Sequence, residues 1–326
     1  MRAVARVEGA PAFTLNQLAA FVAVADAGTI SGAAAELHVS PSAVSAALSE
    51  LERALRLQLV HRLRAKGVRP TPAGELLLQR ARLLLHQASE LEADARGAEA
   101  GVSGVVRVGC PPWFAPTMLP GLMAGFLARH PEARLDVEEA TQDQLVAGLT
   151  AGTLDVAIMY DLDLAPSWQR APFAHLTPMV VLPADHRLAG SDDGLDLADL
   201  AEDPMVLLDA APSANHAYDC CRRAGFTPRI AYRARTYETA RAFVGRGLGW
   251  TLLVSRAITP VSYEGRPLTV REITAPALDD VAVCVVWHPD TLLTRAARTF
   301  IAHVLRHGAE LLTPRSVRDP GNPQES

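Results

Sequence analysis

The sequence predicts two unlike parts, a small helical domain with a helix-turn-helix and a larger α/β domain, joined by one long helix. Residues 31–55 hold two short helical patterns separated by a tight polar turn. From residue 105 onward, short apolar runs alternate with helical patterns, which is typical of an α/β fold. The length of 326 residues fits about two domains. A helix-turn-helix indicates DNA binding.

Composition limits the classes of protein that the chain can belong to. Hydrophobic residues make up 49% of it, enough for sizeable cores, and the net charge of −5 excludes a wholly basic nucleic-acid binder, so a DNA-binding surface must be local. The four cysteines lack zinc-ligand spacing, so we expect no metal site and a cytoplasmic location. We expect neither a signal peptide nor a membrane span.

The helical domain is expected over residues 13–71, after a flexible leader at 1–12. Apolar residues recur at helical spacing from Leu15 to Ala25, and Gly28 is placed to end that helix. Ser31 is expected to cap the next helix.

The second helix of the motif is expected to begin at Pro41. Ser40 is placed as its N-cap, and proline suits the first helical position because the missing N–H has no partner there. Apolar residues then repeat at helical spacing of four, three and four, which gives the helix one buried face: Val44, Leu48, Leu51 and Leu55.

A basic β-hairpin, or wing, is expected to follow the motif. Four cations surround Gly67 before the next acid at Glu75: Arg62, Arg64, Lys66 and Arg69. We expect these cations to bind DNA through its phosphates and so to supply the non-specific, salt-sensitive part of the affinity. A long helix should then span about 72–97. Its apolar residues alternate in spacings of four and three, a heptad seam that favours a dimer over packing on its own domain: Leu77, Ala81, Leu84, Ala88, Leu91 and Ala95. Glycines make 98–104 a hinge.

The α/β domain is expected over 105–312. Strands are predicted at VVRVG, LDVEE, LDVAIMY, MVVLP, MVLLD, RIAYRA, WTLL and VAVCVVW. Helices are predicted at about 117–129, over Gln142–Leu149 and from about Leu292 to Leu312. The polar, proline-bearing tail at 313–326 is expected to be disordered.

The order of these elements resembles that of the LysR-type transcriptional regulators. The resemblance rests on the run from Ala33 to Glu52, on RPTPAGELLL at 69–78, and on VVRVG, LPGLMAGFLARHPEARL, LTAGTLDVAIMYD and VGRGLGWTLL in the larger domain. It covers roughly residues 13–310. It implies a winged helix-turn-helix dimer, joined by the linker helix to a periplasmic-binding-protein-like domain of two α/β lobes. Such dimers commonly pair into tetramers that bend promoter DNA.

The resemblance also implies a function and its partners. We expect a sequence-specific, DNA-binding transcriptional regulator that responds to a small-molecule effector held between the lobes, with RNA polymerase as a further partner if it activates. No cofactor is implied. Lobe 1 should take 105–163 and 268–312, and lobe 2 should take 164–267.

By the same resemblance, Ser31, Ser40, Pro41, Ser42 and Ser45 fall where the family meets DNA, although each serine could instead only cap or solvate a helix. The chain departs from the family here. Contacts to G or A through paired hydrogen bonds need Arg, Lys, Asn or Gln, and none stands on the first two turns. We therefore expect base readout through alanine contacts to thymine methyls, water bridges and DNA deformability. The reading surface would comprise Ser42, Ala43, Ser45, Ala46 and Ser49.

Four segments are expected to line the effector site: Pro111–Thr117, Thr141–Asp143, Asp209–His216 and Thr236–Glu238. Two prolines remove N–H donors from the first segment, and Trp113 and Phe114 add apolar surface, unless these aromatic rings only pack the lobe. An aromatic or partly apolar effector is therefore favoured over a simple carboxylate. The candidate residues are Pro112, Trp113, Phe114, Thr117, Thr141, Gln142, Ser213, Asn215, Thr236 and Tyr237.

Three alternatives were weighed against this interpretation. The adjacent Cys220 and Cys221 suggest a redox sensor of the same fold, although neighbouring cysteines rarely form an unstrained disulfide. A small-molecule binding protein without DNA activity would leave residues 31–71 unexplained. An enzyme is disfavoured because GxSxG, HExxH and Walker A motifs are missing from the sequence.

Overall fold

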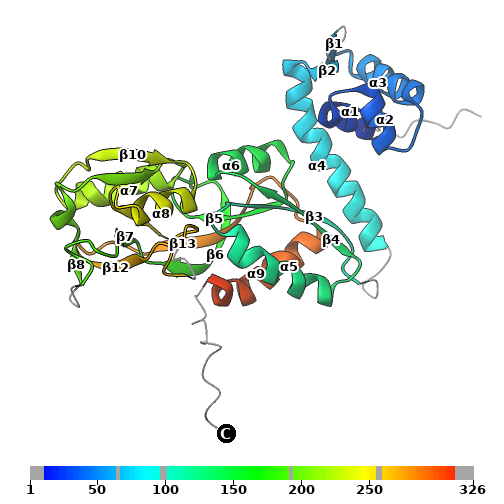
Figure 1. Ribbon diagram of the computed structural model, residues 1–326. Coiled ribbons are helices and arrows are strands. Elements are labelled where there is room, and N and C mark those ends of the chain that lie inside the picture. Colours follow the sequence, from blue (N-terminus) through cyan, green and yellow to red (C-terminus); the bar gives the residue numbers. More distant parts are fainter. Residues whose placement is uncertain (1–10, 64–66, 96–100, 191–193, 255–258, 313–326) are drawn as a thin grey trace, which may run out of the picture. The chain divides into compact units, whose positions relative to one another are not determined.

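The computed structural model describes residues 11–63, 67–95, 101–190, 194–254 and 259–312. Most of the predicted leader, part of the hinge and the predicted tail therefore lie outside the described residues. The chain divides into two compact units, of which the first holds the helical domain and the long helix, and the second holds the α/β domain (Figure 1).

Three helices form the centre of the helical domain: α1 (Leu15–Ala27), α2 (Ile30–Glu36) and α3 (Pro41–Leu55). Their apolar faces bury a common core that includes Leu18, Phe21 and Leu48. The helix α1 ends as expected, because Gly28 adopts the left-handed conformation with φ of 64°. The helix-turn-helix is therefore confirmed, and its two helices are held by the same core.

Helix caps fix where the motif turns. The Ser40 hydroxyl accepts a hydrogen bond from the Ala43 N–H at 3.2 Å, so the predicted cap of α3 is confirmed. The predicted cap of α2 is wrong. Thr29 takes that place, because its backbone is extended and its hydroxyl accepts from the Gly32 N–H at 3.0 Å. Ser31 already lies within the first turn of α2.

The wing is an antiparallel hairpin of β1 (Val60–Leu63) and β2 (Gly67–Pro70), as predicted. Its start is fixed by the Glu52 carboxylate of α3, which accepts from the N–H of Leu59 at 2.7 Å. Its return strand touches the end of α1, where the Val68 N–H donates to the Gly28 carbonyl at 2.7 Å.

The long helix α4 (Pro72–Ala95) begins at the predicted residue. The Thr71 hydroxyl caps it by accepting from the Gly74 N–H at 3.0 Å. The predicted seam is not one uniform face. Ala81 is fully buried in the core of its own helical domain and therefore cannot contact a partner, and Leu77 packs partly on the same core. Leu84 and Leu91 are 43% and 72% exposed, whereas Ala95 has no described side chain.

The first lobe of the α/β domain is built on a five-stranded sheet of order β4-β3-β5-β13-β6. These strands are β3 (Gly104–Cys110), β4 (Ala133–Glu139), β5 (Val156–Tyr160), β6 (Gln169–Leu176) and β13 (Val281–Trp287). The strands β3, β4 and β5 run parallel, and β13 runs antiparallel to its neighbours. The helices are α5 (Ala115–Arg129), α6 (Gln142–Ala151) and α9 (Arg295–Leu312).

Helices enclose the central strands of this sheet. Leu145 and Leu149 of α6 pack against buried residues of β5 and β13. The helices α5 and α9 lie side by side in Figure 1, and Phe126 of α5 meets Phe300 of α9 edge to face at 5.3 Å between ring centroids.

The second lobe holds a four-stranded sheet of order β11-β7-β12-β8 and a pair of order β10-β9. Its strands are β7 (Met179–Pro183), β8 (Leu195–Asp196), β9 (Met205–Leu208), β10 (Ile230–Ala234), β11 (Thr251–Leu253) and β12 (Leu268–Ala275). Its helices are α7 (Ser213–Arg223), α8 (Tyr237–Gly245) and a short 3-10 helix over Leu197–Leu200. Trp250, which is fully buried, packs in one core with Cys221 of α7.

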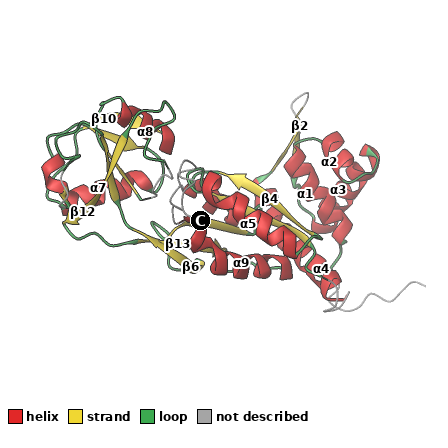
Figure 2. Cartoon of the chain, turned by 60° about the horizontal axis from the view of Figure 1, so that its bottom comes forward, coloured by secondary structure: helices red, strands yellow, loops and turns green. Residues whose placement is uncertain are grey.

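The predicted lobe boundaries are wrong at both crossings. The strand β6 was assigned to lobe 2 but pairs with β13 in the first lobe, and β12 was assigned to lobe 1 but pairs with β7 in the second. Each strand lies next to a crossing, at 176–179 and 275–281, and mixes apolar with polar residues, so its sequence did not mark a lobe. Figure 2 shows the two lobes as separate groups of helices and strands.

Two further features of the described residues concern membranes and metals. No single helix is long and apolar enough to cross a membrane, and the bent pair α1 and α2 passes that test by length and composition alone. No group of three or more His, Cys, Asp or Glu side chains in the described residues could hold a metal ion.

Candidate DNA-binding surface and effector cleft

The outer face of α3 carries only small side chains over its first two turns. Ser42, Ala43 and Ala46 are exposed, and Ser45 and Ser49 are half-buried. The Ser49 hydroxyl donates to the Ser45 carbonyl at 2.9 Å, and Ser40 is occupied by its cap. The exposed side chains of Ser42, Ala43 and Ala46 are therefore available to DNA on these turns, and the Ser42 hydroxyl lies 3.0 Å from that of Ser40. DNA contact by any of these residues stays a prediction.

The wing brings one cation onto this face. Arg62 of β1 donates from Nη2 to the hydroxyl of Ser45 at 3.3 Å. Arg69 of β2 is exposed and is paired across the hairpin with His61. Arg64 and Lys66 lie outside the described residues.

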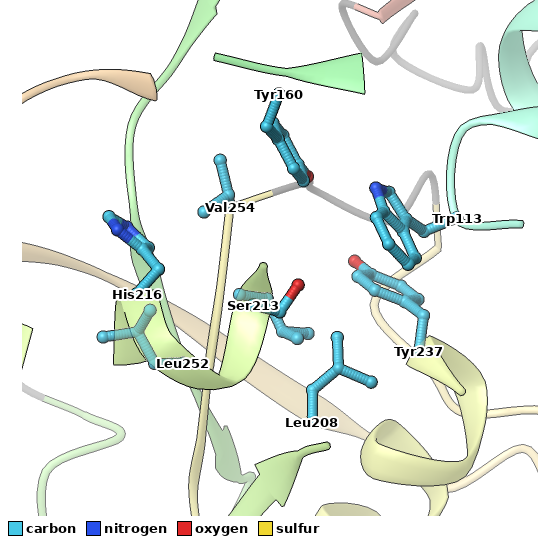
Figure 3. Close-up of a pocket in the computed structure, with 9 residues that line it drawn as sticks. Trp113, Tyr160, Leu208, Ser213, His216, Tyr237, Leu252 and Val254 are labelled. Carbon is cyan, nitrogen blue, oxygen red and sulfur yellow. The ribbon is translucent and has the colours of Figure 1, made fainter. Parts of the chain in front are cut away.

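A small cavity lies at the carboxyl ends of strands from both lobes (Figure 3). Trp113 and Tyr160 reach it from the first lobe, whereas Ser213 and Tyr237 reach it from the first residues of α7 and α8. The other lining residues are Leu208, His216, Leu252, Leu253 and Val254. This is the cleft between the lobes in which an effector was expected.

Aromatic rings form one wall of the cleft. The rings of Trp113 and Tyr160 stack with 6.0 Å between centroids and 12° between planes. Phe114 supports Tyr160 from behind at 4.9 Å, but it is fully buried and packs the lobe. The indole N–H of Trp113 is buried without a hydrogen-bond acceptor of adequate geometry, although the Tyr160 hydroxyl lies near it. It is therefore a donor that a bound molecule could satisfy.

Burial shifts the pKa values of two ionisable groups of the cleft toward their neutral forms. Burial, with the neighbouring Tyr237, raises the pKa of Tyr160 well above its ordinary value. Burial lowers the pKa of His216, partly opposed by Asp219 and Asp163. The His216 ring also lies 3.6 Å from the Cys220 sulfur. Within the described residues, no lining side chain carries a positive charge that would select a carboxylate.

The cavity itself is small, about 10 Å³, which is about the room needed by one water molecule. A larger ligand therefore requires a lining side chain, or a lobe, to move.

Three of the ten predicted effector residues line this cavity: Trp113, Ser213 and Tyr237. The remaining seven do not line it. Gln142 is buried and holds the end of β5, because its amide accepts from the Tyr160 N–H at 3.2 Å and donates to the Leu162 carbonyl at 2.7 Å. Phe114 belongs to the core, and Pro112 is exposed.

Three of the others make local hydrogen bonds with their hydroxyl groups, and Asn215 makes a long-range one with its amide. Thr117 donates to the Phe114 carbonyl at 3.1 Å, and Thr236 caps α8 by accepting from the Thr239 N–H at 3.2 Å. Thr141 donates to Gln144, and the amide of Asn215 donates to Asp163. The sequence suggested polar ligand contacts at three threonines that the fold uses for caps and turns.

Sequence reasoning missed Tyr160, Leu208 and the run at 252–254. A usable signal was present, since all follow or end predicted strands, and ligands in open α/β sheets bind outside the carboxyl ends of strands. His216 lay at the edge of a predicted segment but was not chosen.

The four cysteines are all buried and free. Burial raises the pKa of Cys220 to about 11 and that of Cys221 to about 12, and it likewise raises those of Cys110 and Cys284. A thiol is reactive as its thiolate, so these environments disfavour a redox switch at Cys220 and Cys221.

A winged helix-turn-helix followed by a two-lobed domain with an interlobe cleft defines a ligand-responsive DNA-binding regulator. Residues 15–75 match the bacterial regulatory helix-turn-helix proteins of the lysR family. Residues 99–309 match the LysR substrate binding domain. The chain belongs to the LysR family of transcriptional regulators.

Individual relatives agree with this assignment. The chain is 34% identical to a probable hydrogen peroxide-inducible genes activator of Mycobacterium avium, over 81% of this chain and 84% of the relative. It is similar to the C-terminal domain of a probable LysR family transcriptional regulator from Rhodococcus sp. RHA1, with 55% identity, a TM-score of 0.61 and coverage of 62% and 99%. Full-length CbnR complexed with its target DNA is 25% identical, with a TM-score of 0.50 and coverage of 90% and 99%.

Proposed function

We propose that this regulator responds to an uncharged, aromatic or largely apolar effector that binds between the lobes. The observation that carries the proposal is the lining of the cleft: the stacked rings of Trp113 and Tyr160, four aliphatic residues and a buried indole N–H. An uncharged ring with one hydrogen-bond acceptor would match these groups. A carboxylate would lose its hydration without meeting a cation among the described lining residues.

Effector binding would act by shifting the balance between two lobe arrangements. Because the free cleft holds only about 10 Å³, a ring-sized molecule has to favour a more open arrangement. We propose that this change reaches promoter DNA through the linker helix, and that the protein works in the cytoplasm. RNA polymerase is a further proposed partner if the regulator activates.

Ligand-dependent unfolding tests the proposed effector class. The full-length protein would be heated with a panel of neutral aromatic compounds and, separately, with small carboxylates such as acetate and succinate. A specific ligand raises the unfolding temperature, and Trp113→Ala should remove that rise because it deletes one stacking ring. Thr117→Ala is the matched control, since Thr117 belongs to the same segment but does not line the cavity. Stabilisation by carboxylates alone would contradict the proposal.

We also propose that the protein works as a dimer, and as a pair of dimers on DNA, through the exposed face of α4. The supporting observation is that Leu84 and Leu91, one heptad apart, are left uncovered on this helix. Two linked recognition helices would then meet two half-sites.

The described cysteine sites do not fit the peroxide response that is named for some relatives. The buried cysteines with raised pKa values, described above, give no support to a thiol that reacts at neutral pH. Promoter binding measured before and after peroxide treatment, in the wild type and in Cys220→Ser, should be unchanged in both.

A further inference from the structure

The first two turns of α3, the second helix of the helix-turn-helix, lack long polar side chains. The wing places the long side chain of Arg62 beside these turns. The first two turns of α3 carry no Arg, Lys, Asn or Gln. The guanidinium of Arg62, from β1, is hydrogen-bonded to the hydroxyl of Ser45 at 3.3 Å. Ser45 lies on the second turn of α3, and in a helix-turn-helix the first turns of this helix meet the base edges.

The environment of Arg62 leaves most of its donors unused. In the described part of the helical domain Arg62 forms no salt bridge, and it is exposed. The acids of α3 have other partners, because Glu50 accepts from Gln17 at 2.9 Å and Glu52 accepts from Leu59 at 2.7 Å. A guanidinium has five N–H donors, and Ser45 accepts one of them. The side chain is anchored but not neutralised.

We propose that Arg62 reads a G·C pair in each half-site, and that Ser45 positions it to do so. The planar fork of arginine matches the O6 and N7 acceptors of guanine. The hydrogen bond to Ser45 orders a long side chain before DNA binds, which lowers the entropy lost on binding. The sequence alone assigned Arg62 to the salt-sensitive phosphate contacts and assigned readout to alanine and DNA shape. Because Arg62 is hydrogen-bonded to Ser45, we assign one direct base contact to this wing residue instead.

Site selection followed by single-pair substitution tests this assignment. Binding sites would be selected from a random duplex library with the full-length wild-type protein, and affinity would be measured for the selected site and for each single-pair variant. For Arg62→Lys we expect the preference at one symmetric G·C pair to fall by up to about 150-fold, because the lysine ammonium lacks the planar fork of arginine. Because the charge is kept, the salt dependence of binding should be unchanged.

Two further variants separate reading from charge. Arg62→Gln should move the preference at that same pair from G·C toward A·T, since glutamine matches adenine. Ser45→Ala should weaken the preference at that pair and at no other. Arg69→Lys is the matched control, because Arg69 is an exposed wing arginine paired with His61 on the neighbouring strand. Because Arg69→Lys keeps the positive charge that a phosphate contact needs, it should leave the base preference at every position of the site unchanged.

Two outcomes would overturn the assignment. Equal weakening by Arg62→Gln on all sequences, with a salt slope reduced by about one, would mark a phosphate contact. Unchanged selectivity in both Arg62 variants would mark a purely structural hydrogen bond. Thermal unfolding of each variant shows whether it is folded. If one Arg62 variant does not fold, the other and Ser45→Ala still decide the question.

Discussion

At the scale of single residues, Gln142 shows how a polar side chain can shape the cleft without lining it. Its amide pairs with the Tyr160 N–H and the Leu162 carbonyl, at 3.2 and 2.7 Å, and so fixes the end of the strand that presents the Tyr160 ring. Gln142→Ala would leave two backbone groups unpaired, one of them buried. We expect the free energy of unfolding to fall by about 2–4 kcal/mol, measured by urea denaturation.

The neighbouring threonine provides the control for this prediction. Thr141→Ala removes a half-buried hydroxyl whose partner among the described residues is the nearby Gln144 side chain, so its effect should stay within about 0.5 kcal/mol. Equal effects of the two substitutions would show that Gln142 does not hold the strand end.

A buried histidine makes stability depend on pH. Burial lowers the pKa of His303, with His307 adding repulsion, while its hydrogen bond to the Leu122 carbonyl works in the opposite direction. Arg129 and His130 of the facing helix also lower that pKa. Because the folded state binds fewer protons than the unfolded state, stability is full above the unfolded pKa of about 6.5 and falls as the pH drops below it.

His303→Gln tests this pH dependence. Glutamine can donate to the same carbonyl but does not titrate, so the loss of stability between pH 7.5 and pH 5.5 should be smaller than in the wild type. Urea midpoints at the two pH values measure it. The same loss in both proteins would assign the pH dependence to other groups, of which His216 is one.

At the scale of elements, the wing depends on Gly67, the first residue of its return strand β2. Gly67 has φ of 86°, and an added Cβ would overlap the Gly28 carbonyl oxygen, where the return strand meets α1. Gly67→Ala therefore combines backbone strain with a collision. We expect a loss of more than about 2 kcal/mol in the free energy of unfolding, and weaker DNA binding because the wing is displaced.

Gly28→Ala separates the strain from the collision. Gly28 also has positive φ, 64°, but nothing lies within 4 Å of its Cβ position. Only the strain of about 1–2 kcal/mol should remain. If Gly28→Ala is the more harmful change, the collision at Gly67 is not what limits the wing.

The elements also mark how far the sequence could predict this protein. Periodicity and caps predicted α1, α3, the wing and the start of α4, because each depends on local spacing and on one or two capping residues. The lobes of β6 and β12 were not predicted, because each strand is placed by a partner far away in the sequence. The partner of β6 is β13, more than 100 residues away, and the partner of β12 is β7, about 90 residues away. The resemblance to the LysR family predicted a cleft between the lobes. It did not single out Tyr160, because Tyr160 ends a strand in which every residue is buried.

At the scale of the whole molecule, binding two half-sites requires two copies of the chain. We expect the exposed Leu84 and Leu91 of α4 to form the contact between the two copies. Ala81 cannot take part, because it is buried in the core of its own helical domain. Leu84→Glu places a charge in this seam in both copies. Burial of each leucine side chain stabilises the dimer by about 1.5–3 kcal/mol, and the dimer holds two copies of Leu84. Self-association should therefore weaken by about 100-fold or more.

Sedimentation velocity of the full-length protein over a range of concentrations measures this effect. Ser89→Glu is the matched control, because helical spacing puts Ser89 on the far side of α4 and it is exposed. We expect Ser89→Glu to remain dimeric and Leu84→Glu to dissociate while keeping its helical signal. A dissociated variant should also lose DNA affinity, because it binds one half-site at a time. A dimer that survives Leu84→Glu and Leu91→Glu together would place the interface elsewhere on the chain.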